Sequence, residues 1–307
     1  MTRLLRLIPF TCAALLACVY SFSAHATITV TDDTGAPVSL AAPAQRVISL
    51  APHVTELIYA AGGGSKLVGA VSYSDYPPEA KQIPRVGDNK ALDLERIVAL
   101  KPDLIVVWRH GNAQAQLDRL RELNIPLFFS EPHQLDDIAA TLGKLGQLLG
   151  TSSTADAAAN AYRQEIARLR LRYASRAPVS VFYQVWDQPL MTLNGTHMIS
   201  DVITLCGGRN VFAKLQPLVP TVSTEAVLAA NPEAIITASA GATKPDTPLP
   251  QLDTWRAWPS LKATARNNLF AIDGDLINRP APRLAQGAAQ LCEDLDVARS
   301  RRPAGEP

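Results

Sequence analysis

Large aromatic side chains stand directly after apolar runs that predict β-strands. They are Tyr73 and Tyr76 after residues 66–71, Trp108 at the end of residues 103–108, and Trp186 after residues 179–185. The carboxyl ends of parallel strands face the crevice in which α/β proteins bind ligands. Flat aromatic faces in that place suit a large, flat, partly apolar ligand, whereas the simpler alternative is that they pack on their own loops. As a set, they favour a ligand site.

The residue patterns of common catalytic centres are absent. The sequence has no G-x-S-x-G nucleophile elbow, no Walker phosphate loop and no H-E-x-x-H zinc motif. Residues 62–64 are glycines, but they follow a predicted helix rather than a strand, so they indicate a helix end and not a phosphate cradle. We therefore predict a binding protein with no catalytic residues and no cofactor; the alternative is an exported α/β enzyme.

The histidines do not predict a metal site. Beyond residue 26 they are His53, His110, His133 and His197. Zinc or manganese receptors need several imidazoles and carboxylates that converge on one point. Dispersed residues can still converge in space, but nothing in this spacing predicts that they do, and we expect no metal.

Strand and helix patterns alternate around these residues. Apolar runs predict strands at residues 46–50, 66–71, 103–108 and 126–130, and helical patterns fall at residues 55–61, 94–100, 113–123 and 135–149. Before them, residues 27–40 alternate β-branched and polar side chains around a turn, which predicts a hairpin. Strand–helix repetition of this kind is typical of a mostly parallel sheet with helices on both faces.

Residues 152–176 predict one long helix. They contain no Gly or Pro, and Tyr162, Ile166, Leu169 and Tyr173 form an apolar stripe along it. At about 1.5 Å per residue such a helix reaches roughly 35 Å, enough to cross the molecule. The alternation then restarts, with strands at residues 179–185, 234–239 and 269–273 and helices at residues 198–206, 223–230 and 284–295.

These patterns divide the chain into residues 1–26, 27–150, 151–177, 178–298 and 299–307. We interpret these parts as a signal peptide, an N-terminal lobe, a bridging helix, a C-terminal lobe and a polar tail, which we expect to be disordered from Arg299. The predicted fold class is α/β, with two Rossmann-like lobes of mostly parallel sheet bridged by one long α-helix. A cleft between the lobes is the expected ligand site.

Residues 1–26 have the organisation of an export signal. Two arginines precede an apolar run, and Ala-His-Ala at residues 24–26 fits a cleavage site, so we predict cleavage after Ala26 and a soluble, exported protein. The alternative is a lipoprotein box at residues 15–18, which would leave Cys18 acylated. Without the signal the formal net charge falls from +1 to −1, with both signs spread evenly. Nucleic acid and an anionic membrane surface are therefore not expected partners.

Two of the four cysteines, Cys206 and Cys292, lie beyond the export signal. In an oxidising compartment an even pair most simply forms one disulfide, and two unlinked buried thiols are the alternative. A disulfide that closes so long a loop would raise the free energy of the unfolded chain by roughly 4–5 kcal/mol in the chain-entropy model.

Long stretches of the chain match a known family. The strongest are SYSDYPPEA at residues 72–80, LERIVALKPDLIVVWRHGNAQAQLDRL at residues 94–120 and LCGGRNVF at residues 205–212. In them the chain resembles the cobalamin-binding periplasmic proteins of ABC importers, within the helical-backbone metal-receptor family, and the similarity runs from about Arg46 to Asp296. The resemblance implies a class III periplasmic-binding fold with little hinge closure. It also implies a corrinoid ligand, an inner-membrane permease dimer with its ATPase as partner, and a free protein that is monomeric.

The resemblance assigns ligand contacts to both lobes. Tyr73 would contact the corrin ring, with the prolines of its loop holding it, and Trp108 would be a second ligand-facing aromatic. The matching segment that lines the cleft from the other lobe comprises Asp275, Leu276, Ile277, Asn278 and Arg279.

Two carboxylates and the two cysteines also match the family. Glu95 and Glu225 correspond to glutamates, one in each lobe, that dock onto arginines of the permease and so fix its orientation. The alternative is that each glutamate only favours the start of its own helix. Cys206 and Cys292 match the family's disulfide pair.

Three positions depart from the family pattern. Asn89 stands where the cobalamin-binding members have a tryptophan, and Leu276 and Ile277 stand where they have Trp-Phe. Each aromatic contact contributes on the order of 1 kcal/mol beyond its buried area, and Trp186 is positioned to replace one of them. These departures bear on the identity of the ligand more than on the fold.

Receptors of the same fold for haem or a ferric siderophore are the alternative. Siderophores are anionic, so their receptors often place arginines in the cleft, and Arg109, Arg279 and Arg283 lie near the predicted rim. Haem would need an axial Tyr or His, for which Tyr73 and His110 are the candidates.

Overall fold

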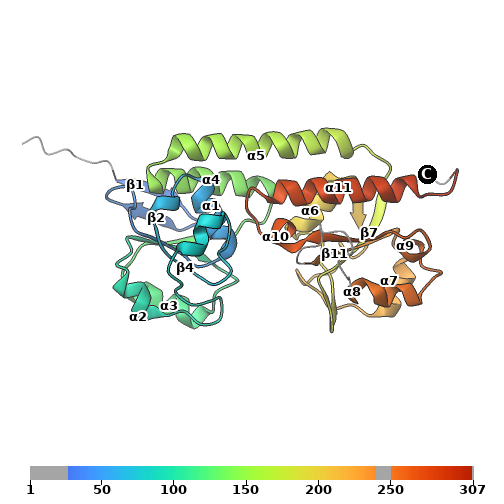
Figure 1. The fold of residues 1–307 in the computed structure, drawn as a ribbon, viewed down its shortest axis with the longest axis horizontal. Helices are drawn as coiled ribbons and strands as arrows, with labels where there is room; N and C mark the ends of the chain where they lie inside the picture. Colours follow the sequence, from blue (N-terminus) through green and yellow to red (C-terminus); the bar gives the residue numbers. More distant parts are fainter. Residues whose placement is uncertain (1–26, 240–249, 306–307) are drawn as a thin grey trace, which may run out of the picture.

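Two lobes lie side by side in the computed structural model, which describes residues 27–239 and 250–305 (Figure 1). Each lobe has a four-stranded parallel sheet at its centre. The predicted α/β class, with parallel sheets flanked by helices, is confirmed. Within the described residues, no helix is both long and apolar enough to span a membrane.

The first lobe begins with a hairpin and continues as an α/β alternation. Its strands are β1 (Ile28–Thr31), β2 (Pro37–Leu40), β3 (Val47–Ser49), β4 (Leu67–Ala70), β5 (Leu104–Trp108) and β6 (Leu127–Ser130). Its helices are α1 (Pro52–Ala60), η1 (Gly64–Lys66), η2 (Pro78–Gln82), α2 (Leu94–Ala99), α3 (Gln114–Glu122) and α4 (Leu135–Leu149). The main sheet has the order β4-β3-β5-β6, and β1 pairs with β2 in antiparallel register. The strands and longer helices expected here are present, with ends that differ by a few residues.

The second lobe adds elements that the sequence analysis did not predict. Its strands are β7 (Val179–Gln184), β8 (Trp186–Asp187), β9 (Leu190–Met191), β10 (Gly208–Asn210), β11 (Ala234–Ser239) and β12 (Leu269–Asp273). Its helices are α6 (Met198–Leu205), α7 (Thr224–Ala230), α8 (Pro250–Asp253), η3 (Thr254–Ala257), α9 (Lys262–Ala265), α10 (Gly274–Ile277) and α11 (Leu284–Ser300). The main sheet has the order β10-β7-β11-β12. The short strand β10 and the β8–β9 hairpin were not expected, because runs of two or three residues carry no periodicity.

The two lobes repeat one topology. In each sheet the second strand along the chain lies at the edge, followed by the first, third and fourth. The third strand is preceded in both lobes by a short helix, a residue with positive φ and a proline. These residues are Lys101 (φ 47°) and Pro102 before β5, and Asn231 (φ 43°) and Pro232 before β11. Helices α2 and α7 are therefore equivalent elements of the two lobes.

Helix α5 (Ser152–Tyr173) passes along both lobes and contacts α4 of the first lobe and α6 and α11 of the second (Figure 1). Its predicted stripe of Tyr162, Ile166, Leu169 and Tyr173 is buried. These side chains belong to one hydrophobic core that includes residues of both lobes. Burial of a shared apolar surface holds the two lobes together, and the predicted bridging helix is confirmed.

The disulfide is present, and the C-terminal tail is more ordered than expected. Cys206 at the end of α6 is bonded to Cys292 in α11, with a Cα–Cα distance of 4.7 Å. Disorder from Arg299 is wrong, because α11 continues to Ser300. The Arg299 Nε donates to the Ala177 carbonyl at 2.7 Å. The end of α11 is therefore held against the segment that leads into β7.

Candidate ligand-binding site

The loop after β4 presents Tyr73 to solvent. Tyr73 has a left-handed backbone conformation (φ 64°), and 78% of its surface is exposed. Its neighbour Ser74 is fully buried, where its hydroxyl accepts a hydrogen bond from Thr55 Oγ1 at 2.9 Å. The carbonyl of Ser74 accepts another from Arg85 Nη2 at 2.8 Å. A left-handed conformation is unfavourable for a bulky residue, so these contacts beneath the loop hold an outward-facing aromatic ring in place.

Trp108, at the end of β5, is fixed by close neighbours. Its ring meets the ring of His53 edge-on, with centroids 5.3 Å apart. Its backbone N–H donates to Asn112 Oδ1, and the Asn112 amide donates to the Leu50 carbonyl, both at 3.1 Å. Gly111 lies against the indole, because a Cβ there would stand 1.7 Å from a ring carbon. Trp108 is therefore half-buried on a rigid support.

His53 stays uncharged behind Trp108. It is buried near the start of α1, and its Nε2 has no hydrogen-bond partner among the described residues. Burial, with a smaller contribution from the positive charge of Arg279, lowers the pKa of His53 to about 3. A neutral imidazole therefore supports the tryptophan at physiological pH.

An ionic cluster joins the two lobes beside the Tyr73 loop. Glu56 of α1 accepts from Arg279 Nη1 at 3.0 Å, from Arg283 Nη2 at 2.6 Å and, through its other oxygen, from Arg283 Nε at 2.9 Å. Asp75 of the loop accepts from the same Arg279 nitrogen at 2.9 Å. Asp275, in the second lobe, pairs with Arg279 Nη2 at 2.8 Å. We call these five residues the interlobe charge cluster.

The aromatic residue Tyr76 adds a further contact between the lobes. The guanidinium of Arg283 lies 3.6 Å from the centre of its ring, a cation–π geometry. A cavity of about 410 Å³ opens beside this contact, lined from the first lobe by Glu56, Tyr59, Ala60, Tyr76 and Pro77 and from the second by Pro282, Arg283 and Gln286. The segment at residues 72–78 thus exposes one tyrosine and ties itself to the other lobe through Asp75 and Tyr76.

The predicted segment of the second lobe is only partly accessible. Asp275 and Asn278 are exposed, Leu276 is half-buried, and Arg279 is engaged in the interlobe charge cluster. Ile277 is 2% exposed and packs in the core, which leaves no side-chain surface for a ligand, so its predicted contact is not supported. The sequence placed Ile277 on a lining segment, but a single helical turn cannot present adjacent residues to the same side.

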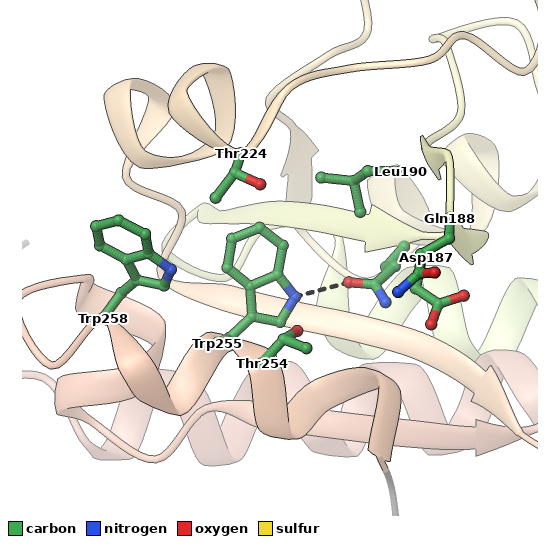
Figure 2. Close-up of a pocket in the computed structure, with 8 residues that line it drawn as sticks. Asp187, Gln188, Leu190, Thr224, Thr254, Trp255 and Trp258 are labelled. Atoms are coloured by element: carbon green, nitrogen blue, oxygen red, sulfur yellow. Dashed lines mark hydrogen bonds between the residues drawn. The ribbon is translucent and has the colours of Figure 1, made fainter.

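Trp186 stands on the β8–β9 hairpin. It is exposed, and its indole N–H donates to the Gln188 carbonyl at 3.0 Å. Behind the hairpin lies a second cavity of about 260 Å³, lined by Gln184, Asp187, Gln188, Leu190, Thr224, Thr254, Trp255 and Trp258. Figure 2 shows the side chains that line it. The Trp255 indole donates to Gln184 Oε1 at 2.6 Å. The aromatic lining of this cavity was not predicted, because Trp255 and Trp258 do not follow a predicted strand.

Glu95 and Glu225 occupy equivalent places in the two lobes. Each is the second residue of its helix, α2 or α7, and each is exposed. The preceding N-cap residues Asp93 and Ser223 accept backbone hydrogen bonds with their side chains, so the glutamates are not needed as caps. In Figure 1 both helices lie on the side of the molecule away from α5.

Two of the residues that connect the lobes were missed by the sequence analysis. Glu56 is the one acidic residue of α1, where the side chains around it are buried, and Asp75 lies in the loop at residues 72–78, which we call the tyrosine loop. A single acid among buried apolar positions is a signal for a buried ion pair, but the sequence does not say which arginine it meets. Across residues 27–239 and 250–305, no three His, Cys, Asp or Glu residues are grouped so that they could hold a metal ion.

Comparison with known proteins defines the class. Residues 47–276 match the model of the periplasmic binding protein family. The vitamin B12-binding protein of Vibrio cholerae is 39% identical over 84% of this chain and 92% of its own length, and that of Yersinia pestis is 42% identical over 82% and 86%. This chain belongs to the periplasmic binding protein family.

Solved structures agree with that assignment. The crystal structure of the periplasmic vitamin B12-binding protein BtuF of Vibrio cholerae has a TM-score of 0.76 and 40% identity, covering 84% of this chain and 98% of that one. The apo haem-binding protein RhuT from Roseiflexus has a TM-score of 0.71 and 25% identity, covering 83% and 99%. The family consists of substrate-binding proteins of transport systems, so this protein is a periplasmic binding protein and not an enzyme.

Proposed function

We propose that this protein captures cobalamin or a closely related corrinoid between its lobes and delivers it to an inner-membrane ABC permease and its ATPase. The observation that carries the proposal is similarity to vitamin B12-binding proteins at 37–42% identity over more than four-fifths of the chain. The exposed aromatic residues at the strand ends support it, because a corrin ring is large and flat.

In this proposal the ring stacks against Tyr73 and Trp108, with Trp186 as a third aromatic contact. From the second lobe, Asp275, Leu276, Asn278 and Arg279 meet its periphery, and Ile277 takes no part. Because α5 and the interlobe charge cluster both join the lobes, the free and bound forms differ little. A site that is already formed loses little conformational entropy on binding.

Export and domain organisation are part of the same proposal. Cleavage after Ala26 would release the periplasmic protein, and acylation of Cys18 would tether it instead; both positions lie outside the described residues. Residues 27–150 and 178–298 would act as the two lobes, residues 151–177 as the bridge, and the free protein would be a monomer.

Glu95 and Glu225 are the proposed docking residues for the permease. Their equivalence in two repeated lobes supports this role, since a permease dimer offers two equivalent sites. The pKa of Glu225 is held below its usual value by hydrogen bonds from its own backbone N–H and from the Ser223 hydroxyl, so it is charged at neutral pH. Two separated carboxylates would set the orientation of docking on arginines.

A haem or ferric-siderophore receptor is the second candidate, favoured by the similarity of fold to haem-binding proteins such as RhuT. The main observation in its favour was a set of arginines near the rim. Arg279 and Arg283 are, however, paired with carboxylates of their own chain, and only Arg109 of that set stands exposed without this role. The corrinoid proposal is therefore the stronger one.

Calorimetric titration of the mature protein tests these alternatives. Cyanocobalamin, cobinamide, hemin and a ferric catecholate would be titrated separately under identical conditions. We expect tight one-to-one binding of cyanocobalamin, which would mean that Asn89, Leu276 and Ile277 are tolerated in place of aromatic residues. Heat with hemin or the catecholate and none with cobalamin would overturn the proposal in favour of the second candidate.

A further inference from the structure

The interlobe charge cluster has both arginines and one carboxylate inside, and its other two carboxylates outside. The side chains of Glu56, Arg279 and Arg283 are 3%, 13% and 16% exposed, whereas those of Asp75 and Asp275 are 40% and 53% exposed. Two arginines therefore face three carboxylates, a formal charge of −1, and the part of the cluster that meets solvent is acidic.

The neighbouring groups do not reverse this charge. Arg85 lies under the tyrosine loop, where it donates to the Ser74 carbonyl, and its Nη1 is buried. His53 is neutral because burial lowers its pKa to about 3. Counting Arg85 brings the local formal charge to zero, but its cation, like those of Arg279 and Arg283, is covered. The accessible groups remain the carboxylates of Asp75 and Asp275.

The cluster lies between the two segments assigned to the ligand. Asp75 is two residues from Tyr73, and Arg279 ends the segment that begins at Asp275. A carboxylate on an incoming ligand would meet the two exposed aspartates first. Arg279 is already paired with both aspartates and with Glu56, so it offers no free donor. A ligand carboxylate would reach Arg283 only by displacing Glu56, which would leave a buried carboxylate without one of its partners, a costly exchange.

We propose that the interlobe charge cluster selects ligands by charge: it admits a macrocyclic metal complex whose peripheral groups are neutral amides and excludes the same ring bearing free carboxylates. This inference rests on the proposed function and names the chemical class of ligand that the site accepts. Asp75 and Asp275 are the residues that determine the selection, and Glu56 keeps the arginines occupied.

Two corrinoids with the same ring test the proposal. Cobinamide carries amide side chains, and cobyrinic acid carries carboxylates in their place. We expect the wild-type protein to bind cobinamide and to bind cobyrinic acid at least about tenfold more weakly, since like charges at a binding surface oppose association. Equal affinity for the two corrinoids would overturn the proposal.

The double variant Asp75→Asn with Asp275→Asn tests the residues named. It should bind cobyrinic acid about tenfold more tightly than the wild type does, and the preference for cobinamide over cobyrinic acid should fall by about the same factor. The control is Glu165→Gln with Asp253→Asn, which removes two exposed, arginine-paired carboxylates on α5 and α8 and changes the net charge equally. The same gain in the control would show that total charge is responsible and would overturn the assignment. Thermal unfolding of each variant checks that the fold is retained.

Failure of the proposed function can be told apart from failure of this inference. If neither corrinoid binds, hemin and hemin dimethyl ester replace them, since the ester lacks the two free carboxylates. Preference for the ester would support selection by charge on a porphyrin ligand, and preference for hemin would overturn it. Absence of binding by all four compounds would overturn both proposals.

Discussion

The two lobes share a backbone plan but use it differently. Helices α2 and α7 place Glu95 and Glu225 at the same position relative to the third strand of each sheet. At the end of that strand, the first lobe has Trp108 on a rigid support, while the second lobe departs from the pattern and carries its aromatic residues on the β8–β9 hairpin and in η3. A repeated backbone therefore retains equivalent exposed carboxylates but not equivalent aromatic positions.

The lobes also differ in how they are fastened. The second lobe has the Cys206–Cys292 disulfide and the contacts of its C-terminal arginines, whereas the first lobe contains no cysteine within its described residues. The tyrosine loop of the first lobe is instead fastened to the second lobe through the interlobe charge cluster. The covalent link thus lies within the second lobe, whereas the ionic links join the two lobes, and the two kinds of link can be removed separately.

The largest effect is expected from removing the disulfide. Cys206→Ser with Cys292→Ser should lower the free energy of unfolding by up to roughly 4–5 kcal/mol, because the unfolded chain is no longer closed across the second lobe. Denaturant unfolding followed by tryptophan fluorescence is informative, since Trp186, Trp255 and Trp258 report on the second lobe. A reductant should shift the wild-type midpoint to the same place and leave the variant unchanged. An unaltered midpoint in the double variant would contradict this prediction.

Reversing the charge of both proposed docking residues should separate transport from ligand binding. Glu95→Arg with Glu225→Arg is expected to abolish uptake of labelled cobalamin by cells that carry the cognate permease, because both docking charges become repulsive. The affinity of the purified protein for cobalamin should stay within about threefold of the wild type, since both residues lie outside the proposed ligand contacts. Each single reversal should impair uptake to a similar degree if the lobes dock equivalently. A large loss of cobalamin affinity in the purified double variant would contradict the docking assignment.

Truncating the aromatic contacts of the first lobe should weaken ligand binding. Tyr73→Ala with Trp108→Ala is expected to reduce affinity for cobalamin by at least about tenfold, because two stacking surfaces are removed. Trp186→Ala measures the contribution of the second lobe by the same titration, and Trp258→Ala, in the separate cavity behind the hairpin, is the control. Unchanged affinity in the Tyr73 and Trp108 variant would place the ligand elsewhere.

Much of the fold followed from periodicity in the sequence. The strand runs, the stripe at Tyr162, Ile166, Leu169 and Tyr173, and the cysteine pair predicted the sheets, the bridging helix and the disulfide, because each depends on local spacing or on a simple count. The disorder expected from Arg299 was wrong, since a polar composition does not reveal that an arginine finds the Ala177 carbonyl. Short elements such as β10 lie below the length at which a pattern exists.

The site was less predictable than the fold. The tyrosine loop stood out by composition, but its partners did not, because Glu56 and Arg279 are 223 residues apart and meet only through the arrangement of the lobes. The same limit explains why the sequence presented Arg279 and Arg283 as cations for an anionic ligand, although both are paired with carboxylates of their own chain. Charge type can be read from a sequence, whereas charge compensation across a fold requires the coordinates.

Two helix-terminal histidines allow the lobes to be compared by pH. Burial lowers the pKa of His53, in α1, to about 3 and that of His197, at the N-cap of α6, to about 4. Each is neutral in the folded state and gains a proton near pH 6.5 when unfolded. Between pH 6.5 and about 4 the unfolded state therefore binds more protons, and stability falls as the pH is lowered through this window.

Replacing His197 should reduce that acid sensitivity. In the wild type the Ile199 N–H donates to His197 Nδ1 at 3.1 Å. His197→Asn keeps a side-chain acceptor at this N-cap position and removes the titrating group. The loss of unfolding free energy between pH 7 and pH 5 should shrink by about 2 kcal/mol relative to the wild type. His133→Asn, which makes the same substitution at an exposed histidine outside α6, is the control. An identical profile for His197→Asn would contradict the expected role of this histidine.

The smallest effect is expected from a methyl group behind Trp108. Gly111→Ala places a Cβ 1.7 Å from a carbon of the indole, so the ring or the loop must shift. If Trp108 stacks on the ligand, its displacement should weaken cobalamin binding by about threefold, less than truncation does, because the aromatic surface is moved and not removed. Gly143→Ala is the matched control, since a Cβ at that position of α4 meets nothing within 4 Å. Affinity unchanged in Gly111→Ala, together with a crystal structure showing a displaced indole, would remove Trp108 from the ligand site and leave Tyr73 as the aromatic contact of the first lobe.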